Sequence, residues 1–145
     1  MCIRDRYNNV SALNYGNVIA NHPEWLYDND ADPNNSSGFV FQTSYPASYY
    51  AKIEDSSYQQ AWAESAINSA KTWGFDGIFV DDLVDREYIS NGNIIVSPKI
   101  DFWQMQSFIH KVSSITRTNG IEFMRNCVED ISSPYGCLLY TSRCV

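Results

Sequence analysis

The sequence has few residues of the kinds that build metal sites and disulfide frameworks. It contains four cysteines and two histidines, and three of the cysteines (Cys2, Cys137 and Cys144) lie near the two ends. The two histidines lack the spacing of metal ligands. A glycine-rich phosphate loop and a Gly-x-Ser-x-Gly nucleophile motif are also absent from the sequence. We therefore expect no metal ion, no cofactor and no disulfide framework.

Basic residues and long apolar runs are also scarce. The chain has 10 Lys and Arg residues against 17 Asp and Glu residues, which gives a formal net charge of −7. A chain this acidic is a poor binder of the phosphate backbone, so we expect no nucleic-acid partner. It has no apolar run of about 18 residues, so we expect no membrane partner. The oligomeric state stays open.

The remaining composition fits one globular domain, and the two ends of the chain differ from the rest of it. Of 145 residues, 44% are hydrophobic and 14% aromatic, which is enough for a packed core. Residues 1–6 and 137–145 resemble translated sequencing adapters at the ends of metagenomic fragments. We therefore expect a single domain over residues 7–136 with artefactual tails and a missing true N-terminus. Localisation then stays unknown, and a secreted or cell-surface protein fits as well as any other.

The hydrophobic pattern alternates between helices and strands. Apolar positions at helical spacing predict helices over 57–73 and 101–118, with Asp55 as a cap and Gly74 as a stop. Unbroken apolar runs predict strands over 77–81 and 121–125 that pair in parallel. Short extended pieces are expected at 38–43 and 49–53, and a loop is expected between the strand over 77–81 and the helix over 101–118. We expect Trp62, Trp73 and Trp103 to lie in the core.

Polar side chains follow both predicted strands, where ligands of parallel α/β folds bind. Asp81 comes directly after the apolar run of the first strand, and Asn126 follows the second. A carboxylate in this position is costly to bury unless it is paired or used. Asp82, one residue later, should point to the opposite side of the strand.

Three segments carry a resemblance to known families. Residues 74–83 read Gly-Phe-Asp-Gly-Ile-Phe-Val-Asp-Asp-Leu, residues 22–26 read His-Pro-Glu-Trp-Leu, and residues 55–58 read Asp-Ser-Ser-Tyr. In this order they resemble the hypothetical glycosyl hydrolase family 15 and the endo-α-1,4-polygalactosaminidase family. The resemblance implies an α/β fold that is a partial (β/α)8 barrel, because a complete barrel needs about 250 residues.

The resemblance also implies a function, namely hydrolysis of a poly- or oligosaccharide by a pair of carboxyl groups. Asp81 matches the strand-end carboxylate of the pattern, as nucleophile or as acid/base. The second carboxylate could be Glu129, Asp130 or Asp55, or lie outside this chain. The expected substrate-binding residues are Asp82, Asn126, Trp25, Asp55 and Tyr49.

Two other functions fit the same residues. One is a non-catalytic carbohydrate-binding barrel, because a fold does not determine a function. The other is a metal-dependent hydrolase in which Asp81 and Asp82 supply oxygen ligands to a hard cation such as Mg²⁺. Further carboxylates or histidines at neighbouring strand ends would distinguish the second function from a glycosidase.

Overall fold

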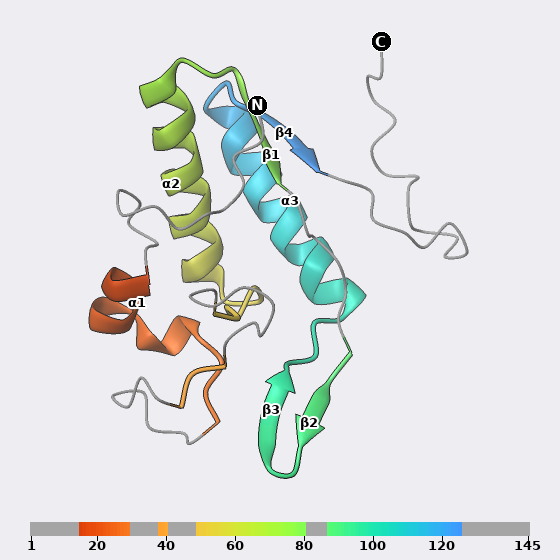
Figure 1. Cartoon of the computed structure of the whole chain (residues 1–145). Coiled ribbons are helices and arrows are strands. Elements are labelled where there is room, and N and C mark those ends of the chain that lie inside the picture. The colour runs from red at the N-terminus through yellow and green to blue at the C-terminus, as the bar shows by residue number, and fades with distance from the viewer. Residues whose placement is uncertain (1–14, 30–37, 41–48, 81–86, 126–145) are drawn as a thin grey trace.

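The structure is a computed structural model that describes residues 15–29, 38–40, 49–80 and 87–125 (Figure 1). It is a mixed arrangement of helices and strands with a small parallel sheet. In chain order the elements are α1 (Tyr15–Asn21), the 3-10 helix η1 (Pro23–Trp25), α2 (Ser56–Trp73), β1 (Gly77–Val80), β2 (Ile89–Asn91), β3 (Ile94–Ser97), α3 (Phe102–Thr118) and β4 (Glu122–Arg125).

The central unit is a parallel pair of strands carried by two long helices. β1 and β4 pair in parallel, with Ile78 opposite Phe123 and Val80 opposite Arg125. Helices α2 and α3 lie side by side, and each leads through a short turn into its strand (Figure 1). The predicted helices and the predicted parallel pairing are therefore confirmed, with helix bounds within one residue of those expected.

Helix ends follow from local chemistry. The side chain of Asp55 accepts hydrogen bonds from the backbone N–H groups of Ser57 and Tyr58, and so caps α2 as predicted. Gly74 ends this helix in the left-handed region with φ of 69°, where glycine has no steric penalty. α3 begins with a capping box, in which Asp101 and Gln104 exchange side chain-to-backbone hydrogen bonds.

The core lies between the two helices and one face of the strands. Ile78 of β1 and Phe123 of β4 are buried at 1% and 4% exposure. They share a hydrophobic cluster with side chains of both helices, including Ala63, Ile67, Ala70, Phe108, Ile109 and Val112. This is the apolar stripe that the 3.6-residue spacing predicted.

The opposite face of the strand pair is less covered. Met124 is 53% exposed, and neither it nor its register partner Phe79 belongs to the hydrophobic cluster. Gly77 lies in register with Glu122, and a Cβ at Gly77 would come within 3.2 Å of the Cβ and backbone oxygen of Glu122. The two strands therefore approach closely only because residue 77 lacks a side chain.

The structure corrects two expectations. The segment expected as a loop contains an antiparallel hairpin, β2–β3, whose turn holds Gly92 at φ of 65°. Its Asn91-Gly92 pair before a β-branched run is a typical hairpin signal. Trp73 and Trp103, expected in the core, are 74% and 76% exposed, whereas Trp62 is partly buried against the core as expected.

The segments before α2 form short extended contacts instead of full strands. Leu26 bridges Ala51, and Asp28 bridges Phe39, both in antiparallel fashion. Of the extended pieces expected at 38–43 and 49–53, the structure describes residues 38–40 and 49–53, with bridges at Phe39 and Ala51, and Ile53 lies in a turn. The expected tails, residues 1–6 and 137–145, lie outside the described residues. Among the described helices, none has the length and apolarity needed to cross a bilayer.

Candidate functional site

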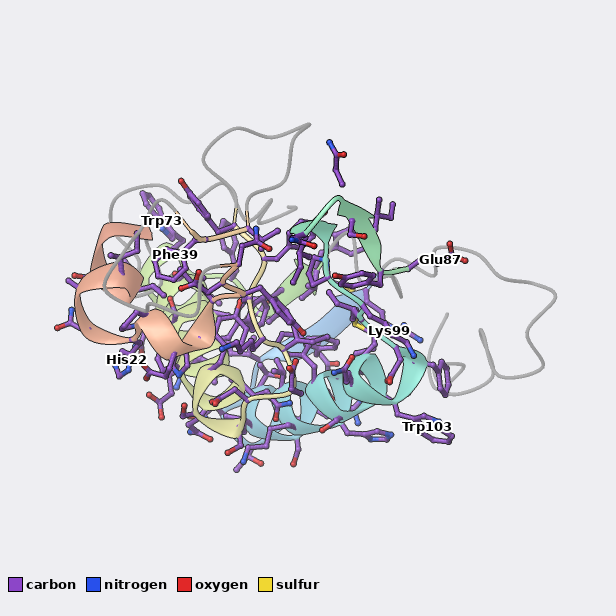
Figure 2. The ribbon with its side chains drawn as sticks, turned by 90° about the horizontal axis from the view of Figure 1, so that it is seen from below. His22, Phe39, Trp73, Glu87, Lys99 and Trp103 are labelled. Carbon is purple, nitrogen blue, oxygen red and sulfur yellow. The ribbon has the colours of Figure 1, made fainter. Side chains whose placement is uncertain are left out.

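The carboxyl ends of β1 and β4 lie on the same side of the molecule as the first turns of α2 and α3 (Figure 1). This follows from the short turns that join the end of each helix to the start of its strand. The N-cap residues Asp55 and Asp101 therefore stand on the side where parallel α/β folds bind ligands. Figure 2 views the molecule from this side.

A chain of hydrogen bonds links Trp25 to Asp55 through Ser57. The indole Nε1 of Trp25 donates to the hydroxyl of Ser57 over 2.7 Å, and that hydroxyl donates to Oδ1 of Asp55 over 2.5 Å. The same Oδ1 accepts from the backbone N–H groups of Ser57 at 2.8 Å and Tyr58 at 3.0 Å. Trp25 and Asp55, two predicted site residues that are 30 positions apart in the sequence, are thus brought together by Ser57.

These hydrogen bonds also set the charge of Asp55. The hydroxyl of Ser57 and the backbone N–H of Tyr58 stabilise the ionised carboxylate and lower the pKa of Asp55 below 3.8. Asp55 is therefore a carboxylate at neutral pH. It suits a nucleophile, a base or a hydrogen-bond acceptor, and it does not suit a general acid.

The indole of Trp25 is enclosed by aromatic neighbours. Only 5% of Trp25 is exposed. The imidazole of His22 stacks on it with ring centroids 3.9 Å apart and planes 7° apart, and Tyr58 meets it edge-on at 5.8 Å. His22 stands at the N-cap of η1 and pairs through Nδ1 with Oε1 of Glu24 at 3.0 Å. Trp25 thus links His22, the residue directly after α1, to the first turn of α2.

Tyr27 and Glu54 form a second polar pair next to this network. The hydroxyl of Tyr27 donates to the carboxylate of Glu54, at 3.2 Å from Oε1 and 3.3 Å from Oε2. Burial and the negative charge of Glu54 raise the pKa of Tyr27 well above 10.0. Tyr27 is fixed through its backbone, which donates to the carbonyl of Tyr50 and accepts from the N–H of Val40.

The other predicted site residues divide into two groups. Tyr49 is half-buried and packs against the hydrophobic core, in the extended segment beside the one that carries Trp25 and Tyr27. Asp81, Asp82 and Asn126 lie outside the described residues, and so do Glu129 and Asp130. The described chain reaches the positions directly before Asp81 and Asn126, where Val80 and Arg125 are register partners.

Sequence reasoning missed Ser57, Tyr27 and Glu54. A serine two residues after a capping Asp is a local signal that could have identified Ser57. No local pattern links Tyr27 to Glu54, because the pair is 27 residues apart and forms only when the extended segments meet. Across the described part of the chain, no group of three or more His, Cys, Asp or Glu residues could hold a metal ion.

Comparison with known proteins gives one family. The model of the hypothetical glycosyl hydrolase family 15 matches residues 4–105, a span that runs from before α1 to the first turn of α3 and so leaves out β4. Neither the curated proteins nor the solved structures give a significant match. The family match covers more than two thirds of the sequence and carries with it a glycoside-hydrolase-like function and a carbohydrate substrate. The chain belongs to the hypothetical glycosyl hydrolase family 15.

Proposed function

We propose that this chain is part of a (β/α)8 glycoside hydrolase that cleaves a poly- or oligosaccharide with Asp81 as a catalytic carboxylate. One observation carries the proposal: β1 pairs in parallel with β4 and ends at Val80, directly before Asp81, inside the family match. The strand order and the helices on one face fit two successive units of such a barrel. The barrel domain would span residues 7–136.

The alternation along β1 supports Asp81 over Asp82. Ile78 and Val80 pack into the hydrophobic cluster with the helices, and Phe79 does not. Side chains alternate along a strand, so a continuation of β1 by one residue would put Asp81 on the side of Phe79, away from the helices. In a barrel this side faces the interior and the substrate, and Asp82 would turn toward the helix layer.

The chemistry proposed for Asp81 is that of a glycosidase carboxyl group. A carboxylate beside the anomeric carbon stabilises the positive charge of an oxocarbenium-like transition state, or attacks the anomeric carbon as a nucleophile while the leaving oxygen departs. A second carboxyl group donates the proton to the leaving oxygen. Asp55 is a poor choice for this proton donor, because its hydrogen bonds hold it ionised. Glu129, Asp130 or a residue outside this chain fits that role better.

The remaining predicted residues would hold the substrate or position those that do. Asn126 follows β4 directly in the sequence and would hydrogen-bond sugar hydroxyls. Asp82 would do so only from the connection after β1, because its direction along the strand is toward the helix layer. Tyr49 contributes an aromatic side chain from the neighbouring extended segment. Trp25 is enclosed, so it would act by holding Ser57 and Asp55 in place.

The test is an Asp81→Asn variant of the protein expressed from the uninterrupted reading frame that contains this chain. Asparagine keeps the shape of the side chain and removes the charge. We expect hydrolysis across a panel of polysaccharides to fall by roughly a thousandfold or more, with an unchanged circular dichroism spectrum. Asp76→Asn, which removes an exposed carboxylate at the amino end of β1, is the matched control and should retain most of the activity.

Two results would contradict the proposal. Loss of activity in Asp82→Asn together with full activity in Asp81→Asn would move the catalytic role to Asp82. A wild-type protein that binds polysaccharides and cleaves none of them would instead be a non-catalytic carbohydrate-binding barrel.

A further inference from the structure

The side chain of Asn29 bonds the β2–β3 hairpin to the segment that precedes the candidate site in the chain. Oδ1 of Asn29 accepts a hydrogen bond from the backbone N–H of Ile95 at 2.7 Å, and Nδ2 of Asn29 donates to the carbonyl of Ile95 at 3.3 Å. The two partners are 66 residues apart in the sequence. The amide of Asn29 thus binds the outer edge of β3 as the backbone of a third strand would.

Asn29 is in turn fixed to the segments around the site. Its backbone N–H donates to the carbonyl of Gly38 at 3.0 Å, and the preceding Asp28 bridges Phe39. Two residues before Asn29, Tyr27 contacts Glu54 beside the cap of α2. The position of the hairpin is therefore linked to the residues directly before α2 through the short, hydrogen-bonded stretch from Tyr27 to Asn29.

The hairpin stands where a substrate-binding element would stand. It belongs to the connection that leaves the carboxyl end of β1 and enters α3. In parallel α/β folds, the connections at this edge build the binding site. In the view from this edge, Glu87 at the start of the hairpin and His22 lie on opposite sides of the molecule (Figure 2).

After the exposed Glu87, strand β2 and the turn of the hairpin carry no charged side chain, and their exposed residues include the apolar Ile89. Residues 88–93 read Tyr-Ile-Ser-Asn-Gly-Asn, and all six are exposed. This stretch contains no charged side chain, although the whole chain carries a net charge of −7. The phenol of Tyr88, 55% exposed, can stack on the apolar face of a sugar ring, and amide groups can bond hydroxyls. A neutral glycan fits such a surface better than a charged polymer does.

We propose that the β2–β3 hairpin binds a neutral oligosaccharide, with Tyr88 as a contact residue and Asn29 as the positioning residue that fixes the hairpin. This inference rests on the proposed glycosidase function and adds the class of substrate and the residue that sets the geometry. Loss of the Asn29 amide would remove the hydrogen bonds that join β3 to the segment carrying Tyr27 and Asn29. Binding of a glycan would then weaken, and the chemical step would change little.

The test compares Asn29→Ala and Tyr88→Ala with wild type in the protein from the uninterrupted reading frame. Hydrogen exchange at the Ile95 amide reports the position of the hairpin. Affinity electrophoresis in gels with arabinoxylan, mixed-linkage β-glucan or galactomannan reports glycan binding, with polygalacturonate and chitosan as charged comparisons. Asn119→Ala is the matched control, because its amide makes the same kind of bond, to the carbonyl of Ile115 at 3.0 Å, at the other end of α3.

We expect faster exchange at Ile95 in Asn29→Ala alone. Dissociation constants for a retained neutral polysaccharide should rise about three- to tenfold in Asn29→Ala and Tyr88→Ala, and stay unchanged in Asn119→Ala. On a cleaved glycan, KM should rise by a similar factor while kcat stays within about twofold of wild type.

Three results would overturn the inference. Unchanged exchange at Ile95 in Asn29→Ala would show that Asn29 does not fix the hairpin. Faster exchange with unchanged glycan retention would show that the hairpin does not bind the glycan, and this failure leaves the catalytic role of Asp81 intact. A wild-type protein that is retained only by charged polymers, or is neither retained by nor active on any polysaccharide, would exclude the neutral glycan, and in the second case the proposed function as well.

Discussion

The indole Nε1 of Trp25 donates a hydrogen bond to the hydroxyl of Ser57 over 2.7 Å, and the bond joins η1 to the first turn of α2. It is partly buried, and the same hydroxyl passes a hydrogen bond to Asp55. Trp25 therefore acts on the cap of α2 through Ser57. A buried donor that loses its acceptor costs more than an exposed one, so the bond should be measurable by substitution.

Trp25→Phe keeps an aromatic ring and removes the N–H donor. We expect a coupling energy of about 1 kcal/mol between Trp25→Phe and Ser57→Ala in a double-mutant cycle followed by urea denaturation. Ser56→Ala, an exposed serine one residue earlier, is the matched control and should show no coupling to Trp25→Phe. Additive effects of Trp25→Phe and Ser57→Ala would mean that the hydrogen bond contributes nothing to stability.

Asp55 should make stability depend on pH in the acid range. Its pKa is lowered in the folded protein by the Ser57 hydroxyl and the Tyr58 N–H, so the folded state binds fewer protons than the unfolded state near pH 3.8. Its contribution is thus complete well above pH 3.8 and is lost as the pH falls through the lowered value.

The measurement is the free energy of unfolding of wild type and Asp55→Asn between pH 3 and pH 7. We expect the wild type to be more stable at pH 7, by less than about 1 kcal/mol because Asp55 is only partly buried, and the difference to shrink as the pH falls toward 3. Asp76→Asn removes an exposed carboxylate elsewhere and serves as the comparison. A constant difference between wild type and Asp55→Asn would contradict the assignment.

The helices and the parallel pair could be predicted because short-range patterns determine them. The apolar stripe of α2, the capping Asp55 and the glycine at Gly74 are all local signals, and each has a direct structural outcome. The unbroken apolar run of β1 predicts a strand buried by its neighbours, and Ile78 at its centre is 1% exposed. These elements also locate the edge at which the candidate site stands.

The predictions that Trp73 and Trp103 lie in the core were wrong, and each has a specific cause. Two residues of helix rotate a side chain by about 200°, so Trp103 points away from the buried Met105 in spite of its closeness in sequence. Figure 2 shows Trp103 pointing outward from the periphery. Trp73 lies on the apolar stripe, but it is the last residue of α2 and extends past the core. The helical spacing of apolar residues predicts the direction in which a side chain leaves the helix, but it does not predict how far along the helix the core extends.

The contacts around the site could not be predicted from local sequence. The bonds from Trp25 to Ser57, from Tyr27 to Glu54 and from Asn29 to Ile95 span 32, 27 and 66 residues. Each depends on how the extended segments before α2 fold back on the helices and the hairpin. The family resemblance predicted only that Trp25, Tyr49 and Asp55 bind the substrate, and not which residues contact them.

Gly77→Ala should separate the two strands at their amino ends. The new Cβ would lie 3.2 Å from both the Cβ and the backbone oxygen of Glu122, and backbone atoms cannot move away cheaply. We expect a loss of stability of about 1–3 kcal/mol and faster hydrogen exchange at the Glu122 amide, which donates to the carbonyl of Asp76 at 2.8 Å. Adding Glu122→Gly to the Gly77→Ala variant should recover part of the lost stability. If none is recovered, the loss does not come from contact with the side chain of Glu122.

Tyr27 should make the protein less stable at alkaline pH. Burial and the charge of Glu54 raise the pKa of Tyr27 in the folded state, whereas the unfolded chain releases that proton near pH 10. The folded state then binds more protons than the unfolded state above pH 10, so the free energy of unfolding falls as the pH rises. Tyr27→Phe cannot ionise and should lose less stability between pH 9 and pH 11.5, as measured by urea denaturation. Tyr88→Phe, which removes the hydroxyl of an exposed tyrosine, should follow the wild-type curve. If Tyr27→Phe loses stability as steeply as wild type, Tyr27 ionises in the folded protein as easily as in the unfolded chain, and its bond to Glu54 has no influence on its charge.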